Sequence, residues 1–243
     1  MISFGDVTKY FGKIKVLDGV NLDLVEGRTY ALVGPNGSGK TTLIKSLLGQ
    51  VVPQKGMITF DGAPIANQWK YREHIGYMPQ IGRYPDTFTI GQLIEMMKDI
   101  RKDSTTADEE LIESFKLYKV FDKRMHTLSG GTRQKVSAVL AFMFNAPVLI
   151  LDEPTAGLDP ISVEILKEKI MTEKARGKLL LITSHILSDM DELATDVVYI
   201  MDGNIQYNNS ISALKIETGE NRLGKAIATM IRQKELVSTV TSR

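Results

Sequence analysis

Short runs of apolar and β-branched residues dominate the first part of the chain and predict β-strands. The predicted strands are, in order, Ile2–Val7, Ile14–Leu17, Val20–Leu24 and Thr29–Val33. Their alternation of apolar and polar residues suggests an antiparallel layer at the start. After a glycine-rich stretch, apolar residues recur at helical spacing from Leu43 to Leu48, and Gly49 is expected to end this helix. The opening pattern is therefore a β layer, then a strand, a glycine-rich turn and a helix.

The middle of the chain has mainly helical periodicity. Met57–Phe60 and His74–Met78 predict two further strands. Thr89–Arg101 and Thr106–Tyr118 then carry apolar residues at helical spacing, with charged residues on the outer faces. A mostly helical insert is therefore expected over about residues 82–145.

Strands and helices alternate in the last third. The predicted elements are the strand Val148–Leu151, a helix from Pro160 to about Ala175, the strand Leu179–Thr183, a short helix near Ser188–Leu193 and the strand Val197–Met201. This alternation favours a parallel sheet covered by helices on both faces. In the tail, about residues 208–243, an amphipathic helix is predicted over Leu223–Leu236, and a surface helix that closes the domain is the simpler interpretation.

Composition narrows the choice of organisation and of partners. The 243 residues show no internal repeat and no Pro/Ser-rich linker, so a single domain over residues 1–243 is predicted. Thirty Lys plus Arg against 29 Asp plus Glu give a net charge of +1, without the basic excess of a nucleic-acid binder, so no nucleic-acid partner is expected. The absence of cysteine excludes disulfides and thiol nucleophiles. The first residues resemble no secretory signal, and the most apolar stretch, Val136–Leu151, is too short to span a bilayer, so a cytoplasmic location is expected.

A phosphate-binding motif follows the fourth predicted strand. The stretch from Gly34 to Thr41 fits G-x-x-x-x-G-K-[ST] and lies between an apolar strand and a helix. Small residues let successive backbone N–H groups turn inward, and the helix N-terminus adds positive potential, so a polyphosphate is the expected ligand. Lys40 is expected to reach the β- and γ-phosphates, and the Thr41 hydroxyl to ligate Mg²⁺. The candidate cradle consists of Gly34, Pro35, Asn36, Gly37, Ser38, Gly39, Lys40, Thr41 and Thr42.

Two acids stand at the end of a predicted buried strand. Asp152 directly follows Val148–Leu151 and is predicted to hold Mg²⁺ at the carboxyl edge of the sheet. Glu153, which should point to the other side of the strand, is predicted to polarise an attacking water as general base. Further on, Asp159 followed by Pro160 predicts an N-cap with proline in the first helical position.

The segment Leu128-Ser129-Gly130-Gly131-Thr132, about twenty residues before these acids, resembles the signature motif of ATP-binding cassette (ABC) ATPases. On its own residues, Ser129 can cap a helix while Gly130 and Gly131 leave N–H groups bare for an anion, and a plain N-cap is the alternative. The resemblance covers the chain from Phe11 to about Gly203. It implies an α/β fold of the P-loop NTPase type: a RecA-like parallel-sheet core with an N-terminal antiparallel β layer and a helical insert subdomain. Thr132 stands where the family most often has glutamine.

The resemblance also implies how two chains combine. In the family, this signature contacts the ATP that the opposite subunit's Walker A loop holds, so Ser129, Gly130 and Gly131 would bind nucleotide in a homodimer, or in a pair with a related cassette. Asp159 lies in the segment that resembles the D-loop, which communicates across that dimer. Phe11 stands where the family places an aromatic ring against adenine, and Tyr10 is the competing candidate.

Two further residues match catalytic positions of the family. Gln80 resembles the Q-loop glutamine, whose amide oxygen can ligate Mg²⁺ and orient water. His185 resembles the switch histidine, which contacts the γ-phosphate and helps Glu153 to hold the attacking water. The catalytic set implied is thus Glu153, His185, Lys40 and Gln80, and the metal set is Thr41, Gln80 and Asp152.

The function implied is an ATPase, with ATP and Mg²⁺, that powers separate transmembrane permease subunits from the cytoplasmic face of the inner membrane. The region Arg83–Phe88 resembles the part that family members dock onto a transmembrane coupling helix. The chain is similar to bacterial exporter-type cassettes, and Ser129–Lys135 and Ser184–Met190 are similar to the cassette of the nitrous-oxide-reductase maturation system, which supports copper-site assembly. The alternative is a non-transport ABC ATPase that acts on nucleic acid or ribosomes; near-neutral charge argues against it.

Overall fold

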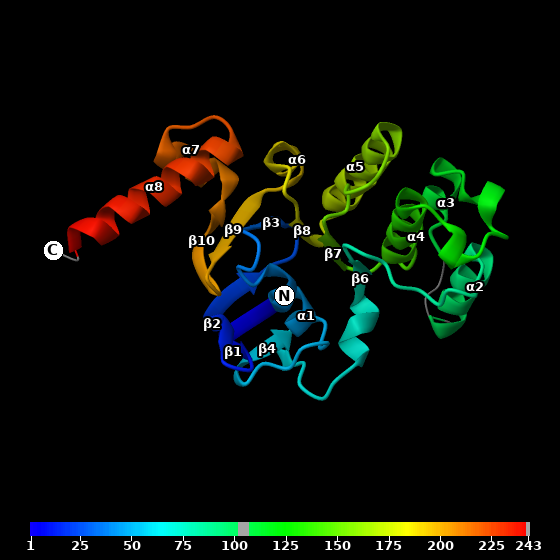
Figure 1. Cartoon of the computed structure of the whole chain (residues 1–243), viewed down its shortest axis with the longest axis horizontal. Helices are drawn as coiled ribbons and strands as arrows, with labels where there is room; N and C mark the ends of the chain where they lie inside the picture. The colour runs from blue at the N-terminus through cyan, green and yellow to red at the C-terminus, as the bar shows by residue number, and fades with distance from the viewer. Residues whose placement is uncertain (102–106, 242–243) are drawn as a thin grey trace.

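Two β-sheets form the centre of the molecule (Figure 1). The computed structural model describes residues 1–101 and 107–241, with side chains as far as Lys234. One sheet has the strand order β2-β1-β4-β5, with β1 (Ile2–Phe11), β2 (Ile14–Leu24), β4 (Lys55–Phe60) and β5 (Ala63–Pro64). The other has the order β10-β9-β3-β8-β7-β6, with β3 (Thr29–Val33), β6 (Ile75–Met78), β7 (Val148–Asp152), β8 (Leu179–Thr183), β9 (Asp196–Met201) and β10 (Asn204–Ser210).

The first sheet is antiparallel, as its pattern predicts. Two predicted strands, Ile14–Leu17 and Val20–Leu24, are in fact one strand, β2, because pairing with β1 continues past Gly19 through an irregular register. The strand Thr29–Val33 does not join this layer. All five of its residues are buried, and it pairs in parallel with β8 and β9 in the second sheet.

The second sheet is parallel apart from its edge strand β10, which pairs antiparallel with β9. Strand β10 has no counterpart in the predicted elements, since polar residues such as Asn208 and Asn209 interrupt its apolar pattern. The carboxyl ends of β3, β7 and β8 lie at one edge because these strands are parallel neighbours. The candidate phosphate cradle and His185 lie in the loops after β3 and β8, and the acid pair lies at the end of β7 and in the residue that follows it.

Helices cover the faces and both ends of this framework (Figure 1). Their bounds are α1 (Lys40–Leu47), α2 (Ile90–Ile100), α3 (Glu110–Ser114), α4 (Gly130–Phe142), α5 (Pro160–Ala175), α6 (Leu187–Leu193), α7 (Ile211–Thr218) and α8 (Leu223–Thr241), with 3-10 turns at Lys70–His74, Leu117–Val120 and Met125–Thr127. Helices α2, α3 and α4 gather at one end of the molecule, and α8 extends from the other end. No helix in the described parts of the chain is long and apolar enough to cross a membrane.

Two apolar clusters lie on opposite faces of the parallel sheet. In β3, Tyr30 and Leu32 face the cluster shared with α1 and the antiparallel sheet, whereas Ala31 and Val33 face the cluster shared with the remaining helices. This alternation follows the period of two along a strand. The sheet is therefore buried on both faces, which explains the continuous apolar runs of its strands.

The second helix of the insert is shorter than its pattern predicts. The prediction covers Thr106–Tyr118; Thr106 lies outside the described residues, and α3 spans only Glu110–Ser114. Lys116 adopts a left-handed conformation with φ 55° and separates α3 from the following 3-10 turn. Helical spacing of apolar residues was therefore compatible with two short turns as well as with one helix.

Candidate functional site

The glycine-rich loop connects β3 to α1, as its motif predicts. Gly34 lies so close to β9 that a Cβ atom there would stand 2.1 Å from the Ile200 carbonyl oxygen. Gly39, just before α1, has φ 109°, a conformation that side chains rarely adopt. The Lys40 ammonium donates hydrogen bonds to the carbonyls of Gly34 and Pro35 at 2.7 and 3.0 Å. The loop therefore curls around Lys40 and places it at the start of α1.

A cavity of about 250 Å³ opens beside this loop. It is lined by Val16, Asn36, Gly37, Gly39, Lys40, Thr41, Thr42, Gln80, Asp152, Glu153 and His185. The cavity thus brings together most of the predicted cradle, both acids, the candidate Q-loop residue and the candidate switch histidine, from segments far apart in the sequence. Ser38 is buried at the back of the loop, 3% exposed.

Glu153 and His185 contact each other inside the site. His185 Nε2 lies 2.8 Å from Glu153 Oε1, and the His185 side chain is 53% exposed against 18% for Glu153. Strand β7 ends at Asp152, and Glu153 is left-handed with φ 50°, so the simple alternation along the strand does not continue into it. Both acids consequently line the same cavity.

Thr183, the last residue of β8, holds the two acids in place. Its hydroxyl donates to Asp152 Oδ1 at 2.5 Å and accepts from the Glu153 N–H at 2.9 Å. The Thr183 carbonyl also accepts from the Glu153 N–H, at 3.1 Å. Sequence reasoning did not select Thr183 or Val16. A signal was available only for Thr183, which stands two residues before His185 at a strand end.

Burial shifts the pKa values of the Asp152 carboxyl and the Lys40 ammonium. It raises the pKa of Asp152 above its ordinary value, against the hydrogen bond from Thr183. Burial also lowers the pKa of Lys40, although the Glu153 and Asp152 carboxylates act in the opposite direction. A partly desolvated ammonium and carboxylate facing one cavity fit a ligand that brings both negative charge and a cation.

The donors present fit a magnesium ion. The Thr41 hydroxyl, the Gln80 amide and the Asp152 carboxylate all line the cavity, and each offers an oxygen ligand. Among the described residues there is no group of three or more His, Cys, Asp or Glu side chains that would hold a metal by itself. Magnesium commonly takes one or two protein oxygens and completes its shell with phosphates and water, so this donor set is sufficient when a nucleotide is present.

Other predicted site residues lie away from this cavity. Phe11 is 49% exposed, with the Lys9 ammonium 5.1 Å from its ring centre. Tyr10 is partly exposed, with the Lys15 ammonium 5.8 Å from its ring. Neither aromatic lines the cavity, so the choice between Phe11 and Tyr10 for the adenine stays open.

The candidate signature residues also lie outside the cavity of their own chain. Ser129 caps α4 by accepting from the Thr132 N–H at 3.2 Å, and its hydroxyl contacts that of Thr132 at 2.9 Å. Ser129 and Gly130 are exposed, and Gly131 is partly exposed. Asp159 caps α5, as predicted, by accepting from Ser162.

A glycine-rich loop between a buried strand and a helix, with an acid pair facing it, defines an α/β protein of the P-loop NTPase class. Residues 17–156 match the family model described as ABC transporter. The chain is 32% identical to an uncharacterized ABC transporter ATP-binding protein, YhaQ, of Bacillus subtilis strain 168, over 92% of this chain and 76% of that one. It is 33% identical to Nod factor export ATP-binding protein I of Burkholderia lata, over 83% of this chain and 68% of that one. The chain therefore belongs to the ABC transporter family, as an ATP-binding cassette with ATPase activity.

Solved structures agree on the fold. An ATP-binding subunit of an ABC transporter matches with a TM-score of 0.87 at 24% identity, over 95% of this chain and 99% of that one. The cassette MJ0796, solved as a dimer in a post-hydrolysis state with ADP and Pi, matches with a TM-score of 0.77 at 23% identity, over 86% of this chain and 98% of that one. These matches confirm the predicted fold class.

Proposed function

We propose that two copies of this chain, or one copy and a related cassette, close around ATP and Mg²⁺ and thereby drive separate transmembrane permease subunits. One observation carries this proposal: the Glu153–His185 pair, at 2.8 Å, faces Lys40 and Thr41 across a single cavity. A carboxylate beside a histidine, opposite a phosphate-binding loop, is the arrangement that positions water for attack on a terminal phosphate.

In the proposed reaction, the water oxygen forms a bond to the γ-phosphorus and the bond from that phosphorus to the β–γ bridging oxygen breaks. Glu153 accepts the proton of the water, and His185 contacts the γ-phosphate and keeps Glu153 in position. Lys40 exchanges its loop carbonyls for phosphate oxygens, which are better acceptors because they are charged. Thr41, Gln80 and Asp152 would hold Mg²⁺, which neutralises charge on the phosphates when bound.

The exposed signature turn supports closure of two cassettes. Ser129 and Gly130 present a hydroxyl and N–H groups to solvent rather than to their own cavity. This turn lies at the N-terminus of α4, a helix of thirteen residues. Such a position suits the binding of an anion that another molecule brings to it. In the proposed dimer, that anion is the γ-phosphate held by the partner's loop.

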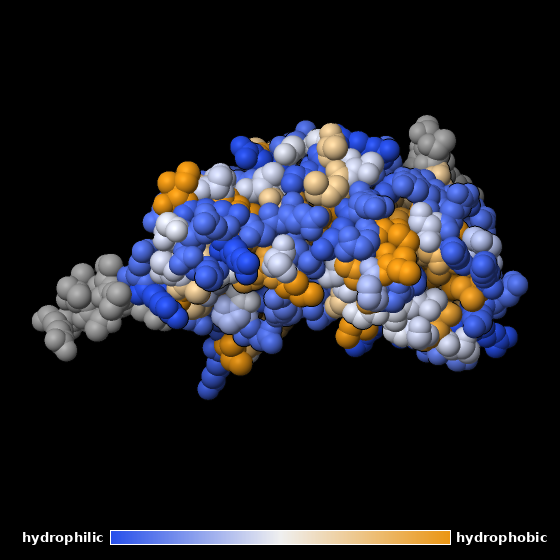
Figure 2. All heavy atoms as spheres, turned by 90° about the horizontal axis from the view of Figure 1, so that it is seen from above, coloured by the Kyte–Doolittle hydropathy of each residue, from blue (hydrophilic) through white to orange (hydrophobic). Residues whose placement is uncertain are grey.

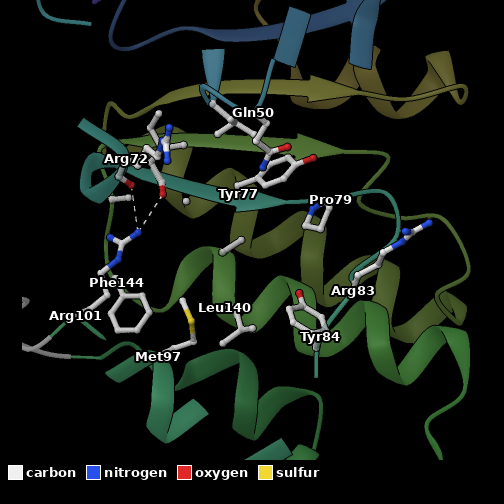
Figure 3. A pocket seen from close by; sticks show the side chains of 15 residues that line it. Gln50, Arg72, Tyr77, Pro79, Arg83, Tyr84, Met97, Arg101, Leu140 and Phe144 are labelled. Atoms are coloured by element: carbon white, nitrogen blue, oxygen red, sulfur yellow. Dashed lines mark hydrogen bonds between the residues drawn. The ribbon is translucent and has the colours of Figure 1, made fainter. Parts of the chain in front are cut away.

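A groove between the sheet and the helical insert is the proposed docking place for a permease segment (Figure 3). It has a volume of about 330 Å³, and its walls combine apolar residues from α2 and α4 with tyrosines and arginines. Tyr84, in its wall, donates a hydrogen bond to the Ser137 hydroxyl of α4, with 2.9 Å between the oxygens. Arg83 and Tyr84 of the predicted docking region line the groove, but Asp86–Phe88 do not. Pro79, the residue before Gln80, also lines the groove, so a segment seated there would touch the chain next to the proposed metal ligand.

On the face shown in Figure 2, apolar side chains occur in groups among polar ones. In this proposal, the permease contact is what holds the chain at the cytoplasmic face of the inner membrane. Relatives named for Nod factor export support the exporter type. The copper-site maturation system stays a prediction based on Ser129–Lys135 and Ser184–Met190.

Hydrolysis is tested by Glu153→Gln, which keeps the shape of the side chain and removes the base. We expect ATP hydrolysis to fall at least about 100-fold, because a positioned general base contributes that much or more. Binding of a fluorescent ATP analogue should persist. Glu164→Gln, at an exposed position of α5, is the matched control. Hydrolysis at the normal rate by the Glu153 variant would show that the base is assigned to the wrong residue.

The permease contact is tested by affinity purification of the tagged chain from native membranes in mild detergent. We expect an integral membrane protein to be recovered with the wild-type chain and lost with Arg83→Glu, which reverses a charge in the groove. Lys225→Glu, at an exposed position on α8, should leave recovery unchanged. If no membrane protein is recovered, or if both variants retain it equally, the docking proposal fails.

A further inference from the structure

A second cavity lies at the opposite end of α1 from the nucleotide loop. It has a volume of about 300 Å³, at the small end of the range for ligand sites, which is about 300–1,000 Å³. Its walls come from the end of α1, the loop after this helix, β4 and the loop after β5. None of its lining residues lines the nucleotide cavity. Most of its side chains are apolar, among them Val51, Pro53, Met57, Ile58 and Ile65.

Arg72 is the only charged residue among the described residues that line this cavity. It is exposed, and in the described parts of the chain its guanidinium forms neither a hydrogen bond nor an ion pair. The guanidinium lies 5.7 Å from the centre of the Tyr71 ring, and the Tyr71 hydroxyl donates to the Leu47 carbonyl at 2.9 Å. Tyr71 therefore places Arg72 beside the end of α1, with the N–H donors of the guanidinium available to an anion.

Ser46 adds a second donor from α1. It is 1% exposed, and its hydroxyl makes no hydrogen bond to any described residue. A buried hydroxyl without a partner costs free energy, so a ligand atom that bonds to it is favoured. Gly49 follows Ser46 by three residues at the helix end, and a Cβ atom at Gly49 would stand 2.5 Å from Arg72 Nη2. Ser46 and Arg72 therefore lie on the same wall of the cavity.

We propose that this cavity binds a small monocarboxylic acid with an apolar tail. The Arg72 guanidinium and the Ser46 hydroxyl would donate to the carboxylate oxygens, and the tail would lie against the apolar walls. A phosphate ester fits less well, because the lining offers one cationic side chain and the C-terminal end of α1 adds negative potential. The site goes beyond the proposed ATPase function and does not depend on it.

The test follows the methyl resonance of Met57 in the full chain, labelled at its methionine methyl groups and assigned with Met57→Leu. A non-hydrolysable ATP analogue and Mg²⁺ are present to fill the nucleotide cavity. We expect the Met57 shift to saturate at millimolar benzoate. Neutral benzamide and inorganic phosphate should bind at least about tenfold more weakly, because the first lacks the charge and the second lacks the tail. Met171, an exposed residue of α5 outside the cavity, is the internal control and should not shift.

Three variants test the two donors. Arg72→Gln should weaken benzoate binding by about tenfold or more, whereas Lys70→Gln, at an exposed position outside the lining, should leave it unchanged. Because Arg72 also lines the proposed docking groove, the chain is measured without a membrane partner. Ser46→Ala should weaken binding about fivefold without lowering the melting temperature, since the chain itself loses no hydrogen bond.

Two results would overturn the site: a Met57 resonance that benzoate does not shift, and an Arg72→Gln variant that binds benzoate as tightly as the wild type. Benzamide or phosphate that binds as tightly as benzoate would overturn the choice of a monocarboxylic acid. The readout is at Met57, so its outcome is separate from whether the chain hydrolyses ATP.

Discussion

Lys169 of α5 is a buried ammonium outside the nucleotide site, and its removal is expected to loosen the insert from the sheet. Its side chain is 1% exposed and lies 2.6 Å from both Asp108 and Glu110, which precede and begin α3. Glu173, one turn further along α5, lies at 3.5 Å. The perturbation we choose is Lys169→Met, which keeps the apolar stem and removes the charge.

The size of the stability loss depends on how the acids are solvated after the ammonium is removed. Removing one partner of a fully buried ion pair costs about 3–5 kcal/mol, because the remaining charge has no partner. Here the Asp108 and Glu110 side chains are 25% and 60% exposed and can regain water. Glu173 is buried but keeps Arg176 at 2.7 Å and Lys178 at 2.5 Å. We therefore expect the free energy of unfolding to fall by about 2 kcal/mol, below the fully buried limit.

The loss should depend on pH with a definite sign. Burial raises the pKa of Asp108, but the hydrogen bonds from Lys169 and the Glu110 N–H, together with the charges of Lys169 and Arg176, outweigh burial, and the folded-state pKa lies below its ordinary value of 3.8. A depressed carboxyl pKa stabilises the fold above the unfolded-state value, and that stability is lost as the pH falls through the folded-state value. The difference in free energy of unfolding between wild type and Lys169→Met should thus be largest near neutral pH and shrink below about pH 4.

Urea unfolding at several pH values measures this difference, with Lys98→Met as control. Lys98 lies 2.8 Å from Glu109 and 3.2 Å from Glu95, and all three side chains are at least 32% exposed, so its loss should cost at most about 1 kcal/mol. Equal losses for the two variants, or a loss at Lys169 that does not change with pH, would refute this reasoning.

Two further substitutions test the geometry of the nucleotide site. Gly34→Ala should lower the free energy of unfolding by about 2 kcal/mol and weaken ATP binding, because the new Cβ would stand 2.1 Å from the Ile200 carbonyl oxygen. Gly37→Ala meets no neighbouring atom, so only its left-handed φ of 80° is unfavourable, and the cost in thermal unfolding should be about 1 kcal/mol. Thr183→Val removes the hydrogen bond that lowers the pKa of Asp152, so that pKa should rise further and the acidic limb of the pH–rate profile should move to higher pH. An unchanged acidic limb would contradict the role of Thr183.

Local motifs were sufficient to predict the parts of the site that neighbours in sequence determine. The Gly34–Thr41 stretch fixed the position of α1, whose first residue is Lys40. The caps at Ser129 and Asp159 were likewise predicted from their own residues and are confirmed. These features depend on backbone groups within three or four residues, so the sequence contains the whole cause.

Contacts across the fold were not accessible in the same way. The pairing of Glu153 with His185 joins residues at the ends of two neighbouring strands, and only the family resemblance indicated it. The hydrogen bonds of Thr183 and Gln134 to the acid segment depend on the left-handed turn at Glu153, which no local pattern predicts. Polar edge strands such as β10 escape prediction because pairing with a neighbour, not burial, holds them.

The central claim is that the loop of one chain and the Ser129 turn of another bind the same triphosphate. Sedimentation velocity of the Glu153→Gln variant with ATP and Mg²⁺ tests it most directly. We predict that this variant forms a dimer only with nucleotide. A second substitution, Ser129→Arg, should abolish the dimer. It should not weaken nucleotide binding to the single chain, because Ser129 does not line that chain's own cavity. A monomer at every ATP concentration, or a dimer that survives Ser129→Arg, would contradict the claim.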